Sequence, residues 1–267
     1  DQTRRQRQMC IRDSSYSSEK RFKVHTLAFY NLENLFDTIN DTSKRDEASP
    51  IMEMKYNRSE VYNKKIKNLS KVISGIGFEE TKTLPTIVGL CEVENKNVVE
   101  DLINSDLLKN ANYGISHFDS PDERGIDVAL IYRKNMFKIL NENSAYLELK
   151  YASGKINYTR DQLVVEGVLE NEKIYIIVNH WPSRSGGELG SRPYRNKAAE
   201  LNMYIIDSIQ SINKNAKIIT MGDFNDDPTN ESIKKILGAK DSRNNLKNSD
   251  LYNPWENLFK SGVGTLV

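Results

Sequence analysis

Short apolar runs, each followed at once by polar residues, recur along the chain and predict buried strands. The run 217–221 shows the pattern clearly, because it leads directly into Gly222-Asp223-Phe224-Asn225. Three other runs end in the same way, so polar groups gather where strands finish. The four runs with the polar residues that follow them are 22–30 with Asn31, 84–91 with Glu92, 174–178 with Asn179 and His180, and 217–221 with Asp223 and Asn225.

Apolar residues recur at helical spacing in the longer segments between these runs. Residues 59–76 predict a helix with Ser59 as its N-cap. Residues 194–212 predict a second long helix, and a short one is expected over 97–109. Residues 38–55 are polar and irregular, which predicts a loop.

Two further strands begin with polar residues: Asp127 opens the run to Tyr132, and Arg160-Asp161 opens the run to Leu169, before a hairpin turn at Asn171-Glu172. Sites in open α/β sheets gather at the carboxyl ends of strands. If these two strands run antiparallel to the other four, all six polar ends share one rim. Hairpins mixed with strand-helix-strand units predict an α/β protein with mixed sheets. No repeat or linker divides it, so residues 22–267 are interpreted as one domain.

Composition narrows the class of protein without naming a partner. Of 267 residues, 38% are hydrophobic and 28% charged, which is typical of a soluble globular protein. The net charge of +1 neither requires nor excludes nucleic acid. Two cysteines, Cys10 and Cys91, are too few for a disulfide framework or a zinc-thiolate site. No apolar stretch is long enough to span a membrane, and nothing indicates an obligate protein partner or a compartment.

The first 21 residues are interpreted as a tail outside the domain. They carry several arginines but no apolar signal-peptide core. Residues 9–14, Met-Cys-Ile-Arg-Asp-Ser, resemble the translated end of a sequencing-library transposon. We therefore interpret residues 1–14 as an adapter artefact, and no function is assigned to Cys10.

The residues at the predicted rim suit a metal-assisted reaction on a phosphate. Glu92 and Asp223 offer hard oxygen ligands for Mg²⁺ or Mn²⁺, which bind through one or two carboxylates plus phosphate. Asn31 and Asn225 can complete the metal shell or orient a phosphate without adding charge. A bound metal would lower the pKa of a water molecule or polarise the phosphorus centre.

Three basic residues can complete this chemistry. His180 can act as an acid or stabilise a negatively charged transition state. Arg160 and Arg184 can form bidentate hydrogen bonds with phosphate oxygens. Asp127, at the start of its strand, is placed with Arg160, Arg184 and Asn225 in the predicted phosphate-binding set.

Each of these residues also has a simpler interpretation when taken alone. A single Glu after a strand is usually solvated, a single His is more often structural, and Arg184 in a Ser/Gly-rich loop is more often a solvated charge. Residues 119–122, Asp-Ser-Pro-Asp, are interpreted as a turn. The coincidence of polar groups at six strand ends favours the site.

At these residues the sequence resembles the endonuclease/exonuclease/phosphatase superfamily, with the deoxyribonuclease-I-like fold, and in particular its bacterial endonuclease members. The resemblance runs from about residue 22 to the carboxyl end. Gly-Asp-Phe-Asn alone is a moderate signal, and it becomes strong after a Glu and a His in this order. The stretches that carry it are 30–37 (Tyr-Asn-Leu-Glu-Asn-Leu-Phe-Asp), 89–95 (Gly-Leu-Cys-Glu-Val-Glu-Asn), 124–130 (Arg-Gly-Ile-Asp-Val-Ala-Leu), 159–161 (Thr-Arg-Asp), 179–184 (Asn-His-Trp-Pro-Ser-Arg) and 222–225 (Gly-Asp-Phe-Asn).

The resemblance implies two mixed sheets packed as a sandwich and flanked by helices, with in-line attack of water on a phosphoester. It implies that Glu92 is the principal metal ligand and that Asn31 contacts metal or phosphate. It also implies that His180 stabilises the pentacovalent phosphate. Asp223 would position or deprotonate the attacking water and also touch the metal, and Asn225 would orient the phosphate.

One departure from the family pattern concerns the carboxyl end. The family finishes with a strand pair carrying an Asp followed by a His or a Gln, and nothing after Thr265 supplies it. The resemblance therefore implies a fragment with little or no activity.

The function expected is a metal-dependent nuclease or phosphodiesterase, with nucleic acid or another phosphoester as substrate. A phosphatase acting on a small or lipid phosphoester is the alternative with the same rim. A non-catalytic binding module is the alternative from another class. Endo- or exonucleolytic cleavage is left open.

Overall fold

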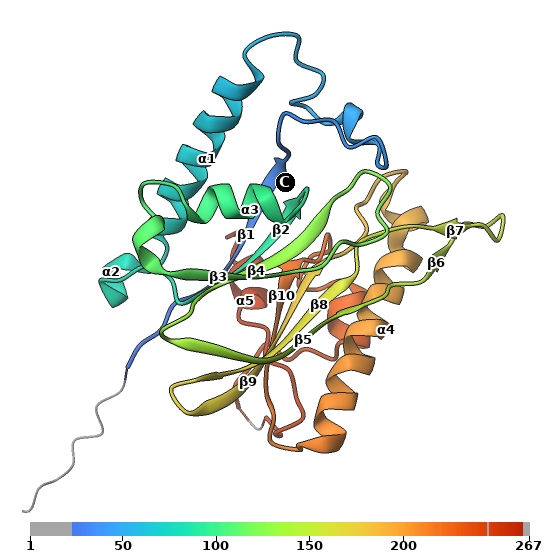
Figure 1. The fold of residues 1–267 in the computed structure, drawn as a ribbon. Coiled ribbons are helices and arrows are strands. Elements are labelled where there is room, and N and C mark those ends of the chain that lie inside the picture. Colours follow the sequence, from blue (N-terminus) through green and yellow to red (C-terminus); the bar gives the residue numbers. More distant parts are fainter. Residues whose placement is uncertain (1–22, 245, 264–267) are drawn as a thin grey trace, which may run out of the picture.

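Two four-stranded mixed sheets form the body of the protein in this computed structural model, which describes residues 23–244 and 246–263 (Figure 1). The predictions about residues 1–21 and about the chain end after Thr265 lie outside the described residues. The first sheet has the order β1-β2-β4-β3 and the second has the order β10-β9-β8-β5. The strands are β1 (Leu27–Leu35), β2 (Ile87–Val93), β3 (Tyr113–His117), β4 (Asp127–Arg133), β5 (Phe137–Ala145), β8 (Gln162–Leu169), β9 (Glu172–His180) and β10 (Lys217–Asp223), with a small hairpin of β6 (Leu149–Lys150) and β7 (Ile156–Asn157).

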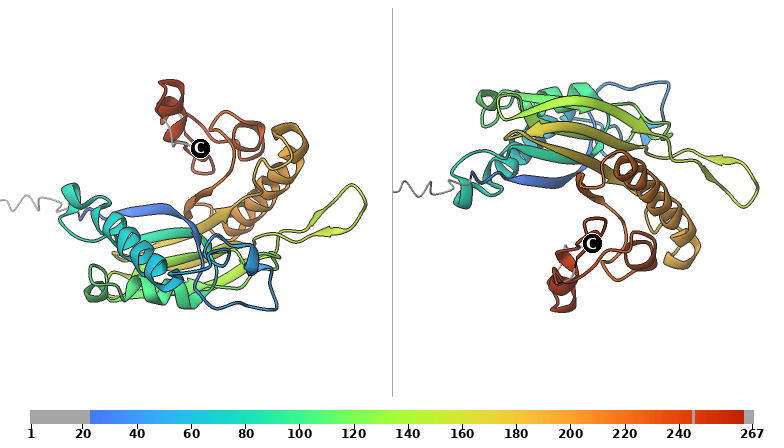
Figure 2. Two further views of the ribbon diagram at one scale, coloured as in Figure 1. Left: turned by 90° about the horizontal axis from the view of Figure 1, so that it is seen from above. Right: turned by 90° about the horizontal axis from the view of Figure 1, so that it is seen from below.

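The sheets face each other across an apolar layer. Side chains of β2, β4, β8 and β9, such as Leu130 and Ile176, fill it and are fully buried. Helices cover the outer faces, so the predicted α/β sandwich flanked by helices is confirmed (Figure 2). The helices are α1 (Arg58–Gly75), α2 (Phe78–Thr81), α3 (Lys96–Ile103), α4 (Glu188–Ile212) and α5 (Trp255–Lys260), with short 3₁₀ turns at Asp46–Ala48 and Lys109–Ala111 and a π-helical turn at Ser232–Ile236.

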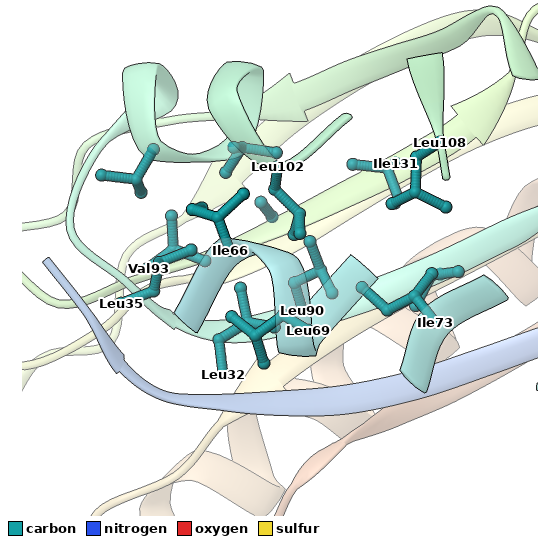
Figure 3. Packing of buried hydrophobic residues seen from close by; sticks show 14 of the residues in the cluster. Leu32, Leu35, Ile66, Leu69, Ile73, Leu90, Val93, Leu102, Leu108 and Ile131 are labelled. Atoms are coloured by element: carbon teal, nitrogen blue, oxygen red, sulfur yellow. The ribbon is translucent and has the colours of Figure 1, made fainter. Parts of the chain in front are cut away.

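Helix α1 packs on the first sheet through apolar residues at helical spacing. Ile66, Leu69 and Ile73 fall on one face of the helix and are buried against Leu32 and Leu90 (Figure 3). Burying apolar area of this kind contributes about 25 cal/mol per Å² and fixes β1 and β2 in place. Helix α4 does the same for the second sheet through Ile205 and Ile206.

The strand directions bring the polar ends to one rim, as expected. Strand β1 is parallel to β2, and β9 is parallel to β10. Strand β4 is antiparallel to β2, and β8 is antiparallel to β9. Within each sheet, the ends of two strands and the beginning of one therefore lie at the same edge. A hydrogen bond from Asn31 of the first sheet to Asp223 of the second brings these two edges together.

Several predicted boundaries were wrong. The first strand does not stop at Asn31, because it continues to Leu35 across an irregularity at which Glu33 and Asn34 adopt positive φ. Helix α4 begins earlier than predicted, at Glu188. Ser59 does not cap α1, since the helix starts at Arg58 after Asn57.

Two other predicted boundaries also differ from the structure. The helix expected over 97–109 is shorter, as α3 ends at Ile103. At the hairpin, Glu170 and Asn171 both have positive φ and form the turn, so Glu172 already belongs to β9. Two consecutive residues with positive φ are typical of the turns that match the twist of paired strands.

Candidate phosphoesterase site

Asn31 joins the two sheets at the rim. Its Nδ2 donates to Glu92 Oε1 at 3.0 Å and to Asp223 Oδ2 at 3.2 Å. Its Oδ1 accepts from the backbone N–H of Glu33 at 2.7 Å, which fixes the orientation of the amide. A donor between two carboxylates offsets their repulsion and marks the position at which positive charge is favoured.

Glu92 sits on a bulge in β2. The register of β2 against both neighbours shifts between Cys91 and Val93, and Glu92 has φ 58°. The bulge turns its side chain to the rim, where Oε2 accepts from Asn34 N–H at 2.7 Å. A non-glycine residue in this conformation is strained by about 1–3 kcal/mol, and such strain clusters at functional sites.

Asp223 and Asn225 are held by the end of β9. Asp223 ends β10, and its Oδ1 accepts from the Asn225 N–H at 3.0 Å. Trp181 N–H donates to the Asp223 carbonyl at 2.9 Å, and Asn225 Nδ2 donates to the Trp181 carbonyl at 2.9 Å. The side chains of Phe224 and Trp181 meet edge to face at 4.7 Å between ring centroids, which anchors the turn below the rim.

His180 lies between the two carboxylates and the protein interior. Its Nε2 is 3.8 Å from Glu92 Oε1, and its side chain is only 5% exposed. Burial lowers the pKa of His180 well below its ordinary value, and the nearby charges of Arg160 and Arg124 lower it further. The ring is therefore neutral at neutral pH. Nδ1 is buried and has no hydrogen-bond partner among the described residues.

The three other predicted phosphate-binding residues differ in their exposure. Arg184 is 40% exposed, donates to the Asn225 carbonyl at 3.0 Å and pairs with Asp227 at 3.1 Å. Arg160 is buried, pairs with Asp122 at 3.2 Å and donates to the Trp181 carbonyl at 2.7 Å. Both side chains lie next to the rim, but only that of Arg184 reaches the surface.

Asp127 is buried and already engaged by protein groups. Its Oδ1 accepts from the N–H of Ser120 at 2.8 Å and from the Ser120 hydroxyl. Its Oδ2 lies 3.2 Å from His117 Nε2. These contacts fix the segment between β3 and β4 and leave the carboxylate no contact with the open rim.

The donor atoms at the rim fit a hard divalent cation. Glu92 and Asp223 present carboxylate oxygens on either side of the Asn31 amide. Cys91, His180 and Asp223 also place potential ligand atoms within 4.8 Å of one another. Cys91 is fully buried in the apolar layer, and burial raises the pKa of its thiol well above the ordinary value, so it stays protonated and is a poor ligand. The carboxylates are thus the better pair for Mg²⁺ or Mn²⁺.

Two residues near the centre were missed at the sequence level. Asp122 was interpreted as part of a turn, yet it is buried and contacts both Arg124 and Arg160. Arg124 belongs to one of the stretches that carry the family resemblance, and that stretch was the available signal.

The chain is similar to known proteins in sequence and in fold. The model of the "Endonuclease/Exonuclease/phosphatase family" matches residues 26–267. A search of curated proteins gave no match. Among solved structures, an endonuclease/exonuclease/phosphatase family protein from Bacteroides thetaiotaomicron matches with a TM-score of 0.53 and 16% identity, over 80% of this chain and 66% of that one. A functionally unknown conserved protein from Enterococcus faecalis gives a TM-score of 0.50 and 16% identity, over 80% and 71%.

A humanized D. rerio TDP2 matches with a TM-score of 0.48 and 14% identity, over 79% of this chain and 66% of that one. The chain spans between 46% and 66% of the length of the TDP2 structures it matches.

The helix-flanked sandwich of two mixed sheets is the class of fold that this chain shares with the Bacteroides thetaiotaomicron family protein. This chain belongs to the endonuclease/exonuclease/phosphatase family. No helix within residues 23–244 and 246–263 has the length and apolar character needed to cross a membrane.

Proposed function

We propose that the chain carries the metal-binding centre of an enzyme that hydrolyses phosphodiester bonds with the help of a divalent cation, Mg²⁺ or Mn²⁺, with nucleic acid as its substrate. The observation that carries the proposal is the convergence of Glu92 from one sheet and Asp223 from the other on the Asn31 amide. Bringing two carboxylates together is unfavourable unless a positive group lies between them. A cation bound there would polarise the phosphorus centre and lower the pKa of a water molecule.

The protein groups have distinct roles in this proposal. Glu92 and Asp223 hold the cation, and Asn31 keeps the two carboxylates in register. The other Asp223 oxygen and Asn225 orient the water and the phosphate. Neutral His180 donates a hydrogen bond to the phosphoryl oxygens, which needs no proton uptake at neutral pH.

Replacement of Glu92 by Gln tests the metal assignment. We expect Mg²⁺-dependent hydrolysis of bis-p-nitrophenyl phosphate and of single-stranded DNA to fall about 100-fold, equivalent to about 2.7 kcal/mol in the barrier. Glu172→Gln is the matched control, since Glu172 is 63% exposed at the opposite end of β9. Unchanged Mg²⁺-dependent turnover in Glu92→Gln would show that the assignment is wrong.

The same assay distinguishes substrate classes. A nuclease turns over DNA faster than p-nitrophenyl phosphate, whereas a phosphatase shows the reverse preference. Calorimetric titration with Mn²⁺ reports the cation site even in a preparation with little turnover.

A further inference from the structure

Asp122 holds two arginines in different directions. It lies in the loop between β3 and β4, and its side chain is 4% exposed. Oδ2 accepts from Arg160 Nη1 at 3.2 Å. Oδ1 accepts from the N–H of Arg124 at 2.9 Å and lies 3.4 Å from Arg124 Nε. One buried carboxylate therefore orients both guanidinium groups.

Arg160 points into the protein. Its side chain is 6% exposed, and its Nη2 donates to the Trp181 carbonyl at 2.7 Å. The same carbonyl accepts from Asn225 Nδ2 at 2.9 Å. Arg160 therefore fixes the peptide that aims Asn225. Both of its terminal nitrogens donate to protein groups, while its buried Nε has no hydrogen-bond partner among the described residues.

Arg124 points outward. Its side chain is 53% exposed, and only its Nε is engaged by a carboxylate among the described residues. It lies three residues before Asp127, which begins β4 at the rim, and it shares the Asp122 carboxylate with Arg160. The two terminal nitrogens of Arg124 have no hydrogen-bond acceptor within the described part of the chain.

The loop that carries Arg124 is held firmly. Ser120 is fixed by Asp127, and Lys44 Nζ donates to the carbonyls of Ser120 at 3.0 Å and Asp122 at 3.4 Å. The N–H of Gly125 donates to the Asp122 carbonyl at 3.0 Å, in a turn in which Gly125 has φ 73°. A guanidinium held on such a loop is already ordered before an anion binds, so less conformational entropy is lost on binding.

We propose that Arg124, aimed by Asp122, binds the phosphoryl oxygens of the substrate, and that Arg160 is a positioning residue for Asn225. This inference rests on the proposed function for its substrate class. A guanidinium presents parallel N–H donors that match two phosphate oxygens, and Arg124 has the exposure needed to reach them. The sequence predicted that Arg160 contacts the phosphate, but Arg160 is buried. The proposal assigns that contact to Arg124, which is exposed and contacts the same Asp122 carboxylate.

Titration with inorganic phosphate tests Arg124 independently of turnover. In the presence of Mg²⁺, we expect Arg124→Ala to weaken phosphate affinity about 10-fold in calorimetry, with Arg124→Lys in between. Arg45→Ala is the matched control, because Arg45 is 68% exposed, pairs with Glu123 and should leave the affinity unchanged. Wild-type affinity in Arg124→Ala, or no phosphate binding by the wild type, would overturn the proposal. Absence of hydrolysis with intact, Arg124-dependent phosphate binding would count against the proposed function alone.

Kinetics on bis-p-nitrophenyl phosphate separate the two arginines. Arg124→Ala should raise KM about 10-fold with a smaller change in kcat. Arg160→Lys should lower kcat about 10-fold and leave phosphate affinity within twofold of the wild type. If a folded Arg160→Lys weakened phosphate binding as much as Arg124→Ala does, the positioning role would be wrong. Circular dichroism melting verifies that each variant is folded.

Discussion

At the scale of single residues, Gly222 is required by the close approach of β10 to β9. A Cβ at this position would clash with the Asn179 backbone carbonyl oxygen, and that carbonyl cannot move without breaking the strand pair. We expect Gly222→Ala to destabilise the fold by about 2–4 kcal/mol and to displace Asp223. Urea unfolding measures the loss.

Gly190 is the matched control for that substitution. It lies in α4, and a Cβ there would meet nothing within 4 Å. Gly190→Ala should therefore raise stability by up to about 1 kcal/mol, because Ala is the better helix former. Equal effects of the two substitutions would refute the steric argument.

Glu94 makes stability depend on pH. Burial raises its pKa to about 7, and the carboxylates of Asp37, Asp46 and Asp41 add to the effect against the lowering N–H of Asp37. The folded protein therefore keeps a proton that the unfolded chain loses above about pH 4.5. The contribution of Glu94 to stability should be full below that pH and be lost as pH rises to about 7. The loss should be on the order of 2 kcal/mol, since solvent that reaches the carboxyl group reduces the effect of the shift.

Replacement of Glu94 by Gln should remove that decline. Urea unfolding at pH 5 and pH 8 measures it in the wild type, in Glu94→Gln and in the exposed control Glu79→Gln. The same decline in all three proteins would show that another group titrates.

At the scale of elements, a buried ion pair joins α4 to the turn after β10. Arg195 Nε donates to Asp226 Oδ1 at 2.6 Å, and the two side chains are 0% and 1% exposed. Asp226 also accepts from Asn230 and Ser232, so its carboxylate holds the segment that follows Asn225.

Removing one partner of this pair leaves a charge buried alone. Arg195→Ala should cost about 3–5 kcal/mol of stability. The exposed pair of Arg192 and Glu188 in the same helix provides the control, since Arg192→Ala should cost less than about 1 kcal/mol. Thermal unfolding compares the two, and similar losses would contradict the difference in burial.

Element types followed from periodicity, whereas element ends did not. The apolar stripe of α1 predicted its buried face, because helical spacing is a local property of the chain. The start of α4 was predicted too late, because the polar residues of its first turn carry no apolar spacing. The extension of β1 past Asn31 depends on pairing between Leu35 and Val93, residues far apart in the sequence.

At the scale of the whole molecule, the candidate metal site connects the two sheets. Glu92 comes from one and Asp223 from the other, so a cation bound by both favours the folded state by mass action. Mg²⁺ or Mn²⁺ at about 100 times its dissociation constant should add about 2.7 kcal/mol of stability to the wild type.

Differential scanning fluorimetry with and without Mn²⁺ measures this effect. The shift should be largely lost in Asp223→Asn and retained in Glu172→Gln. An equal shift in all three proteins would show that the cation binds elsewhere.

The sequence by itself predicted six of the eight strands in the two sheets and their polar ends, because an apolar run followed by polar residues is a local pattern. It did not predict the edge strands β3 and β5, and it placed the polar ends on one rim only on the condition that two strands run antiparallel. It identified Asn31, Glu92, His180, Asp223 and Asn225 as neighbours. Only the tertiary structure decided which charged side chains are buried and paired and which are exposed to a substrate. Arg160 and Asp127 are enclosed, and Arg124 is left exposed, because burial and pairing depend on which distant segments cover a side chain. Asp122 could not be distinguished from an ordinary turn residue until the fold brought Arg160 against it.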